Sequence, residues 1–397
     1  MKITVRHLLA GTFKTMVWGI GILVSLLPRF IRRSRDRVII ARLDAIGDFV
    51  LFTPCLSHLR RKYQAAEITL VVEKKALPLA VACPHVDEVY GIDTQVFRSS
   101  AFYRLANLVR MAVKAPSVFV NPVFSREQIV DELALWSRAE TKIAWDGDLS
   151  NLSESEKRRG NRIYSTLITS LASGPIHESE RNAEFLSRIG VEVSSYAFEL
   201  WGSSSSALMA EELWDTHSLT ARTVIALVPG SLHSFKSWGV EKFSSLIDEI
   251  AKLRPDALFV VIGGEAEKES AVNLVGAHPD RVLDLCGETS LDQLGPIFGR
   301  CRLVVGNDTG PLHIAVAAGA PTVGIVGGGH FGRFLPYQGP ASKWNASPRV
   351  ANWPMLCYGC NWKCIYEVAG GEAVPCIAGI DVQAVLELVK PMLSAET

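Results

Sequence analysis

The most informative stretch of the chain is Gly306-Asn307-Asp308-Thr309-Gly310-Pro311-Leu312-His313, between an apolar run and a run of small residues. This order predicts a strand, a tight turn and a helix, so that backbone N–H groups and the positive helix end point at one place. A diphosphate fits such a place, and the side chains of Asp308, Thr309 and His313 would stand beside it. A helix cap followed by a buried helix explains the same residues without a ligand.

Strand-like and helix-like segments alternate along most of the chain. We expect strands at 37–43, 68–72, 86–90, 117–120, 224–228, 257–262, 282–285, 303–305 and 322–326. We expect helices at 48–63, 97–114, 126–139, 182–189, 240–253, 267–276, 290–299, 312–318 and 382–393. This alternation is typical of parallel sheets covered by helices, so the sequence predicts an α/β fold.

A run of serines interrupts the alternation at 202–206, and we expect the connection between two domains at about 201–223. The predicted organisation has four parts: 1–36, 37–205, 206–345 and 346–397. The second and third are Rossmann-like, doubly wound domains, and the fourth is a cysteine-rich tail with a final helix. Two such domains facing one another would leave a central cleft at the carboxyl ends of their strands, where ligands of these folds bind.

Composition limits the classes of function. The chain has 397 residues, of which 48% are hydrophobic, so two sizeable domains with their own cores are expected. Its 41 basic and 41 acidic residues give a net charge of +0. No long basic tract interleaved with aromatic residues is present, and we therefore expect no nucleic-acid partner.

The first 36 residues form an unusual segment. Residues 15–27 are almost wholly apolar, with Lys14 before them and several arginines after them. The run is shorter than the ~20 residues of a comfortable membrane span, and no small-residue cleavage site follows it. Basic residues beside an apolar segment suit anionic lipids, so we predict an N-terminal apolar helix that lies on a membrane surface. A short span, or packing on the protein's own core or on a partner, is the alternative.

Three further loops offer polar side chains after predicted strands. Asp48 begins a helix after the first strand, where its carboxylate could accept a proton from a hydroxyl nucleophile or could simply cap the helix. The loop 229–238 supplies the Ser231 hydroxyl and the Lys236 ammonium, which suit phosphate oxygens, although its glycine spacing is not that of a P-loop. Glu265 follows two glycines and could hold a ribose diol or belong to a plain turn.

These loops, taken together, resemble those of glycosyltransferase family 9, the ADP-heptose:lipopolysaccharide heptosyltransferases and their relatives. The motifs occur in the family's order: 42–48 with Thr53-Pro54, Pro229-Gly230-Ser231 with Lys236 and Trp238, Gly263-Gly264-Glu265, the stretch 306–313, and Arg333-Phe334-Leu335-Pro336-Tyr337. The resemblance covers residues from 37 to the C-terminus and leaves the N-terminal segment out. It implies a GT-B fold, with two Rossmann-like domains and the donor held mainly by the second.

The resemblance also implies an activity: inverting transfer of a heptose or related sugar from an ADP-sugar to a cell-envelope glycolipid such as the lipopolysaccharide core. Asp48 would be the general base, and Lys236 and Ser231 would bind the diphosphate. Glu265 would bind the ribose, and the nucleobase would lie near 286–289. The sugar and diphosphate would contact Asp308, Thr309 and Gly310, with His313 nearby. Lys236 and the helix terminus would stabilise the leaving diphosphate, so no metal cofactor is required for catalysis. The expected place is the cytoplasmic face of the bacterial inner membrane.

Four of the eight cysteines gather near the C-terminus: Cys357, Cys360, Cys364 and Cys376. Four thiols within about twenty residues favour a small tetrahedral metal site, and we predict a structural zinc or iron there. A subgroup of the family, the autotransporter heptosyltransferases, carries a four-cysteine iron site in this region, although the spacing here is not plainly theirs. Reduced cysteines in a packed loop are the alternative. In either case we expect a structural rather than catalytic role, because the cluster lies far from the predicted cleft in sequence.

Two other classes of function compete with a glycosyltransferase. A dinucleotide-dependent oxidoreductase is disfavoured, because 43–48 lacks the Gly-x-Gly-x-x-Gly spacing that lets the backbone approach a pyrophosphate. A non-catalytic protein that binds a nucleotide sugar is disfavoured by the acid at Asp48 and the cation at Lys236. A UDP or GDP donor, or a protein acceptor, remains an open alternative.

Overall fold

The computed structural model describes residue 19 and residues 37–172, 176–193, 196–337 and 348–394. The predicted membrane-associating segment 1–36 therefore lies outside the described residues, apart from residue 19, and stays a prediction. Among the helices that are described, none is both long and apolar enough to cross a membrane.

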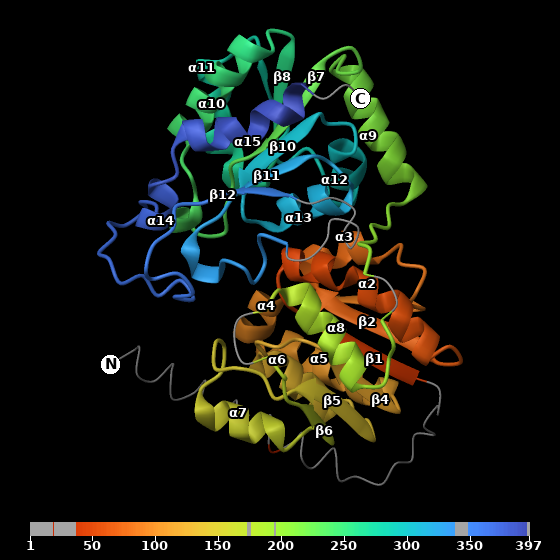
Figure 1. Ribbon diagram of the computed structural model, residues 1–397. Coiled ribbons are helices and arrows are strands. Elements are labelled where there is room, and N and C mark those ends of the chain that lie inside the picture. The colour runs from red at the N-terminus through yellow and green to blue at the C-terminus, as the bar shows by residue number, and fades with distance from the viewer. Residues whose placement is uncertain (1–18, 20–36, 173–175, 194–195, 338–347, 395–397) are drawn as a thin grey trace. The chain divides into compact units, whose positions relative to one another are not determined.

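The chain folds into two compact units, each assembled from several segments (Figure 1). In the described part of the chain, unit 1 comprises 37–44, 56–171 and 181–193, and unit 2 comprises 45–55, 172–180 and the residues from 194 onward. The first turns of the helix that follows the first strand thus pack with unit 2, while the rest of that helix packs with unit 1. The predicted domain boundaries at 205 and 345 stay predictions.

Unit 1 is built on a six-stranded, fully parallel sheet in the order β3-β2-β1-β4-β5-β6. Its strands are β1 (Arg37–Arg42), β2 (Glu67–Glu73), β3 (Glu88–Ile92), β4 (Val118–Asn121), β5 (Thr141–Trp145) and β6 (Thr166–Ile168). Its helices are α3 (Leu77–Ala80), α4 (Thr94–Ser99), α5 (Ala101–Lys114), α6 (Gln128–Trp136), α7 (Glu154–Asn161) and most of α8 (Glu178–Arg188), with α2 (Ile46–Lys62) shared between the units. Buried side chains of α5 and α6 cover one face of this sheet.

Unit 2 repeats this architecture with the order β12-β11-β10-β7-β8-β9, again all parallel. Its strands are β7 (Thr223–Val228), β8 (Ala257–Val261), β9 (Val282–Asp284), β10 (Leu303–Asn307), β11 (Thr322–Ile325) and β12 (Arg349–Ala351). Its main helices are α9 (Ser204–Thr216), α10 (Val240–Leu253), α11 (Lys268–Ala277), α12 (Leu291–Phe298), α13 (Gly310–Ala317), α14 (Pro375–Ala378) and α15 (Val382–Ser394).

The sequence pattern explains why these strands are central. β7 and β10 are almost continuous apolar runs, as expected for parallel strands covered on both faces. On one face, buried residues of α10, α11 and α15 pack against alternate strand residues such as Ile225 and Val305. In Figure 1, α9, α12 and α13 lie together on the other side of this sheet.

The structure contains three strands and four helices in segments where we predicted no element from the sequence: β5, β6, β12, α3, α7, α9 and α14. β5, β6 and β12 are five, three and three residues long, too short for their alternation to stand out from neighbouring loops. The serine run that we interpreted as a connection instead starts α9, because the Ser203 side chain accepts a hydrogen bond from the Ser206 amide at 3.1 Å.

The strand order fixes where ligand-binding loops can gather. In unit 2 the chain runs outward from β7 through β8 and β9 and then returns to β10 on the other side of β7. Ligands of open α/β sheets bind at such a switch point, beyond the carboxyl ends of the strands. The loops after β7 and β10 are the two that contain 229–238 and 308–310.

Candidate functional site

Asn307 joins the two loops at the switch point of unit 2. Its side chain is fully buried at the end of β10 and donates to the carbonyl oxygen of Pro229 at 2.6 Å and to that of Gly230 at 3.3 Å. The same side chain accepts a hydrogen bond from the Trp238 amide at 3.2 Å. A buried amide with all of these partners fixes the loop 229–238 against the turn 308–310. Asn307 belongs to the motif 306–313, but we predicted no role for it from the sequence.

The first turn of α2 lies directly against the N-terminus of α13, within unit 2. A Cβ atom added to Gly310 would lie 2.8 Å from the Ile46 side chain, and one added to Gly47 would lie 2.8 Å from the His313 ring. Both glycines are therefore required by close approach rather than by their turns. Asp48, one residue after Gly47 and in the first turn of α2, is thereby placed next to the start of α13.

His313 lies between two oxygen-bearing side chains. Its Nδ1 is 2.8 Å from the Tyr337 hydroxyl, and its Nε2 is 3.6 Å from the Asp308 carboxylate. Burial raises the pKa of Tyr337 well above its ordinary value, and the Asp308 carboxylate raises it further, so the hydroxyl stays protonated. The hydroxyl can then donate a hydrogen bond to Nδ1 of His313, while Nε2 faces the Asp308 carboxylate.

Thr309 and Lys236 lie at the same end of the sheet. Thr309 occupies the N-cap position of α13, and its hydroxyl donates back to the Asn307 carbonyl at 3.2 Å. Lys236 is half-buried at the end of a short 3-10 helix, Ser234–Lys236. Burial lowers the pKa of its ammonium, and the Asp308 carboxylate opposes that shift. Lys236 and Asp308 are therefore close enough to interact electrostatically.

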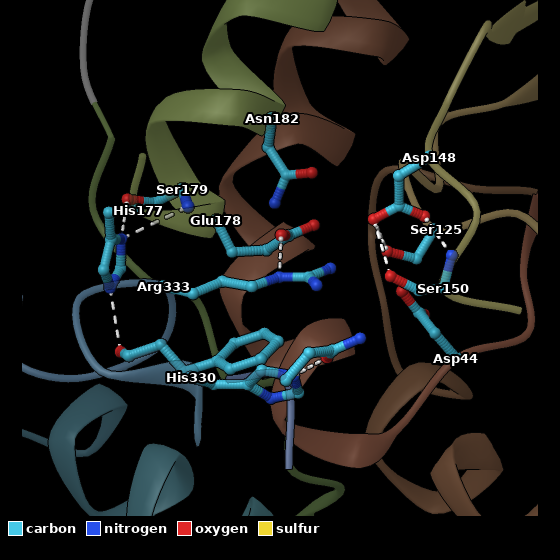
Figure 2. Close-up of polar contacts among 12 residues, drawn as sticks. Asp44, Ser125, Asp148, Ser150, His177, Glu178, Ser179, Asn182, His330 and Arg333 are labelled. Carbon is cyan, nitrogen blue, oxygen red and sulfur yellow. Dashed lines mark hydrogen bonds and ion pairs between the residues drawn. The ribbon is translucent and has the colours of Figure 1, made fainter. Parts of the chain in front are cut away.

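The loop after β11 contributes His330 and Arg333, for which we predicted no role from the sequence. Burial lowers the pKa of His330, the Asn361 side chain opposes this, and the charges of Arg333, Lys236 and Asp308 also act on it. Arg333 pairs with the buried Glu178 carboxylate at 3.3 Å, and its carbonyl accepts from the Glu178 amide at 2.8 Å (Figure 2). Arg333 and His330 thus add a second cation and an imidazole near Lys236.

His177 also holds the loop after β11 in place. The Ser179 amide donates to His177 Nδ1 at 3.3 Å, so the proton of His177 lies on Nε2, which is 2.8 Å from the Phe334 carbonyl (Figure 2). The His177 ring also contacts the Tyr337 ring edge-on, with centroids 5.0 Å apart. The motif Arg333-Phe334-Leu335-Pro336-Tyr337 is therefore held by a segment more than 150 residues earlier in the chain.

Glu265 and Ser231 occupy the neighbouring loops. Glu265 is exposed, and a Cβ atom added to Gly287 would lie 2.2 Å from its carboxylate, so the acid lies beside the stretch 286–289. Glu267, which we had not singled out, accepts from the Gly264 amide at 2.7 Å and packs against Gly230. Ser231 is half-exposed and follows Gly230 in the loop that Asn307 fixes.

The four C-terminal cysteines surround one small cavity. Cys357, Cys360, Cys364 and Cys376 all line it, together with Trp362 and Gly328. The Gly328 amide donates to the Cys376 sulfur at 3.3 Å, and all four residues are free thiols. Across the described residues, however, no three histidine, cysteine or acidic side chains are arranged so that they could hold a metal ion. The thiols thus share a cavity without forming a coordination site, and a bound metal stays a prediction.

Unit 1 carries its own polar cluster after β4 and β5. Asp148 accepts from the Ser125 hydroxyl at 2.9 Å and from the Ser150 hydroxyl at 2.8 Å (Figure 2). Asp44 lies at the end of β1 in the same unit and pairs with the fully buried Arg42 at 2.9 Å. These loops lie at the carboxyl ends of parallel strands, where a hydroxyl-rich ligand would find both donors and acceptors.

The arrangement in unit 2 suits one kind of chemistry. Two cations, Lys236 and Arg333, and the positive end of α13 offer charge complementary to a diphosphate. Asp48, in the first turn of α2 that lies against α13, supplies a carboxylate that can accept a proton from an attacking hydroxyl. Together these groups could stabilise a leaving diphosphate while a hydroxyl nucleophile is deprotonated nearby.

Comparisons with known proteins point the same way. Residues 184–352 match the family model of glycosyltransferase family 9 (heptosyltransferase). The chain is 25% identical over 294 residues to lipopolysaccharide heptosyltransferase 3 of Escherichia coli, which covers 71% of this chain and 79% of that protein. It is 22% identical over 322 residues to the lipopolysaccharide core heptosyltransferase OpsX of Haemophilus influenzae, covering 79% and 84% of the two chains.

Solved structures share the fold. A family 9 glycosyltransferase from Veillonella parvula superposes with a TM-score of 0.71 at 20% identity, over 90% of this chain and 97% of that one. The ADP-heptose heptosyltransferase II of Escherichia coli superposes with a TM-score of 0.63 at 17% identity, over 90% and 98%. The predicted α/β, GT-B fold class and the resemblance to family 9 are therefore confirmed, and the chain is a glycosyltransferase.

Proposed function

We propose that this glycosyltransferase, which resembles family 9, transfers a heptose or related sugar from an ADP-sugar to a cell-envelope glycan such as the lipopolysaccharide core, with inversion at the anomeric carbon. The observation that carries the proposal lies within one unit: the first turn of α2, which contains Asp48, packs against the N-terminus of α13, and Asp308 just before that helix interacts with Lys236. The named functions of the relatives supply the sugar and the acceptor class.

In the proposed reaction, Asp48 takes the proton of the acceptor hydroxyl as its oxygen attacks the anomeric carbon. The bond from that carbon to the diphosphate breaks on the opposite face, and ADP leaves with the bonding electrons. Negative charge grows on the diphosphate during this step, so Lys236 and the α13 terminus bind the transition state more tightly than the ground state. Glu265 would hold the ribose, and Ser231, Asp308 and Thr309 the diphosphate and sugar. His313 would stand beside them.

Calorimetric titration of the full chain with ADP, UDP and GDP tests the donor. We expect ADP to bind most tightly and Lys236→Met to weaken that binding, because the substitution keeps the length of the side chain but removes its charge. A preference for UDP or GDP would keep the glycosyltransferase and overturn the ADP-sugar donor. Absence of binding by all three nucleotides would favour a protein that does not use a nucleotide sugar.

The acceptor and the membrane can be tested together. We place the reaction at the cytoplasmic face of the inner membrane, on the strength of the apolar and basic segment 1–36. With ADP-heptose as donor, ADP release should require heptose-bearing lipopolysaccharide core presented in vesicles of phosphatidylethanolamine and phosphatidylglycerol. The chain should sediment with these vesicles. Release with a protein acceptor, or a chain that stays in the supernatant, would contradict the respective part of the proposal.

We also propose that Cys357, Cys360, Cys364 and Cys376 bind a structural zinc or iron ion. The support is their shared cavity and the affinity of grouped thiolates for these metals. Their side chains would have to turn toward a common point. Elemental analysis of protein produced in medium with both metals should find a stoichiometric amount of one of them. The metal should be lost in Cys357→Ser/Cys360→Ser but retained in Cys301→Ser, whose thiol lies elsewhere in the core. Metal-free wild-type protein would contradict the proposal.

A further inference from the structure

The cysteine-bearing loop between β12 and α14 is attached to the donor end of unit 2. Its backbone amides at Gly359 and Asn361 donate to the carbonyls of Gly328 and Gly329, at 2.8 and 3.1 Å, and the Val374 amide donates to the Phe235 carbonyl at 3.0 Å. These contacts bind the loop to two segments at once, the one after β11 and the one that carries Lys236. The loop is far from Lys236 in sequence but is held against the segment that carries it. A structural rather than catalytic role of its cysteines stays a prediction.

Glycines make that attachment close. A Cβ atom added to Gly328 would lie 2.2 Å from the Tyr358 ring, and one added to Gly329 would lie 2.3 Å from the Trp362 ring. Both rings are rigid and held in place, so any side chain at these two positions would push the loop away. The run Gly327-Gly328-Gly329 thus leaves the space that the aromatic side chains of the loop occupy.

Trp362 contacts both functional side chains of this region. The Lys236 ammonium nitrogen lies 4.2 Å from the centre of the Trp362 ring, within the range of a favourable cation–π interaction. The Trp362 indole nitrogen donates a hydrogen bond to His330 Nδ1 at 3.1 Å. The ring therefore supports the ammonium on its face while its edge is tied to the imidazole.

Asn361 completes the chain of contacts. An indole nitrogen can only donate, so Nδ1 of His330 must be unprotonated and the proton must lie on Nε2. That nitrogen is 2.5 Å from the Asn361 side-chain oxygen, which accepts the proton's hydrogen bond. Both nitrogens of His330 are thus engaged by adjacent residues of one loop, which fixes the neutral ring in a single orientation.

The backbone of Asn361 and Trp362 is strained in the conformation that makes these contacts with His330. Asn361 has φ of 50° and Trp362 has φ of 61°, so two consecutive non-glycine residues adopt the left-handed conformation. This region is uncommon for residues with a Cβ, and for a bulky residue it is a real outlier. Such strain persists only where the surroundings fix it, and it concentrates at functional sites.

We propose that Trp362 is a positioning residue for the donor diphosphate: it holds the ammonium of Lys236 in place, and His330 and Asn361 hold its indole in the orientation that does so. This inference rests on the proposed function, in which Lys236 stabilises the leaving diphosphate. A lysine confined to one position before the donor binds loses less side-chain entropy on binding. The loop thereby becomes part of the donor site, although Trp362 itself touches Lys236 rather than the substrate.

A double-mutant cycle between Trp362 and Lys236 tests the proposal. We expect Trp362→Leu to lower kcat for transfer by about 10-fold, the scale of a desolvated cation–π contact. In the Lys236→Met background the same change should have little further effect, because the two residues then act as one unit. Trp362→Phe keeps an aromatic face but loses the bond to His330, so its kcat should lie between the wild-type and Trp362→Leu values. The ADP dissociation constants of the same proteins give a second readout where activity is too low.

Trp353→Leu is the matched control, because Trp353 lies in the same loop, is half exposed and packs against Gly379. It should change neither kcat nor ADP affinity. Equal losses from Trp362→Leu in both Lys236 backgrounds would show a merely structural role and overturn the proposal, as would an unchanged kcat. If Lys236→Met alone alters neither transfer nor ADP binding, the role of Lys236 in the proposed function fails instead.

Discussion

Replacing Asp48 by asparagine should lower kcat for sugar transfer by about 10² to 10⁴-fold, the usual contribution of a general base, while ADP affinity stays unchanged. Asparagine has nearly the same shape but cannot accept the proton of the acceptor hydroxyl. The half-buried Asp48 lies in the first turn of α2, where the helix dipole favours the ionised carboxylate that this role requires. Steady-state kinetics with ADP-heptose and calorimetric titration with ADP measure the two quantities on one preparation.

The competing explanation is that Asp48 only stabilises the start of its helix. Glu241→Gln provides the control, because Glu241 is also an acid in a first helical turn of unit 2, on α10, and is exposed. Both substitutions remove a favourable charge–dipole interaction of similar size. A loss of transfer confined to Asp48→Asn supports the general base. Equal activities in the two variants, or a loss of transfer that follows a loss of thermal stability, would reduce Asp48 to a helix cap.

The sheets could be predicted largely because their central strands are buried on both faces. β1, β7 and β10 are nearly continuous apolar runs, and no other common structure of that length fits them between two helices. Edge strands such as β6 and β12 have three residues each, so pairing with a neighbour rather than their own pattern creates them. Local propensity carries no signal for that pairing.

The residues of the candidate site also differ in how far the sequence could predict them. Asp308 and His313 could be predicted as site candidates because they share one local motif, in which a strand, a turn and a helix follow each other. His330, Arg333 and Trp362 depend on partners far along the chain: His330 binds a residue 32 positions later, and Arg333 pairs with one 155 positions earlier. The residue types alone did not indicate a functional role at these three positions. The positive φ of Trp362 is likewise set by its contacts and not by its sequence.

Removing one partner of the buried Arg104–Glu132 pair should be the most damaging change for stability, at about 3 to 5 kcal/mol. Arg104 on α5 and Glu132 on α6 form a two-pronged ion pair, in which Nε of Arg104 donates to Glu132 Oε2 at 2.8 Å, and both side chains are almost fully buried. In Arg104→Leu the Glu132 carboxylate would remain in the core of unit 1 without its guanidinium. Hydrogen exchange of peptides from α5 and α6 should show that the free energy of local opening is lower in these two helices.

The double variant Arg104→Leu/Glu132→Leu separates the penalty of an unpaired charge from the value of the pair. Replacing both ends of a buried ion pair with apolar side chains is often neutral or stabilising, so the double variant should recover most of the protection that the single one loses. Arg158→Leu is the matched control, because its pair with Glu154 lies four residues along α7 with both side chains exposed. Exposed pairs of this kind contribute little, so exchange in α7 should barely change. If the double variant exchanges as fast as Arg104→Leu, the pair itself stabilises unit 1, and the attraction between its two charges outweighs the cost of removing them from water.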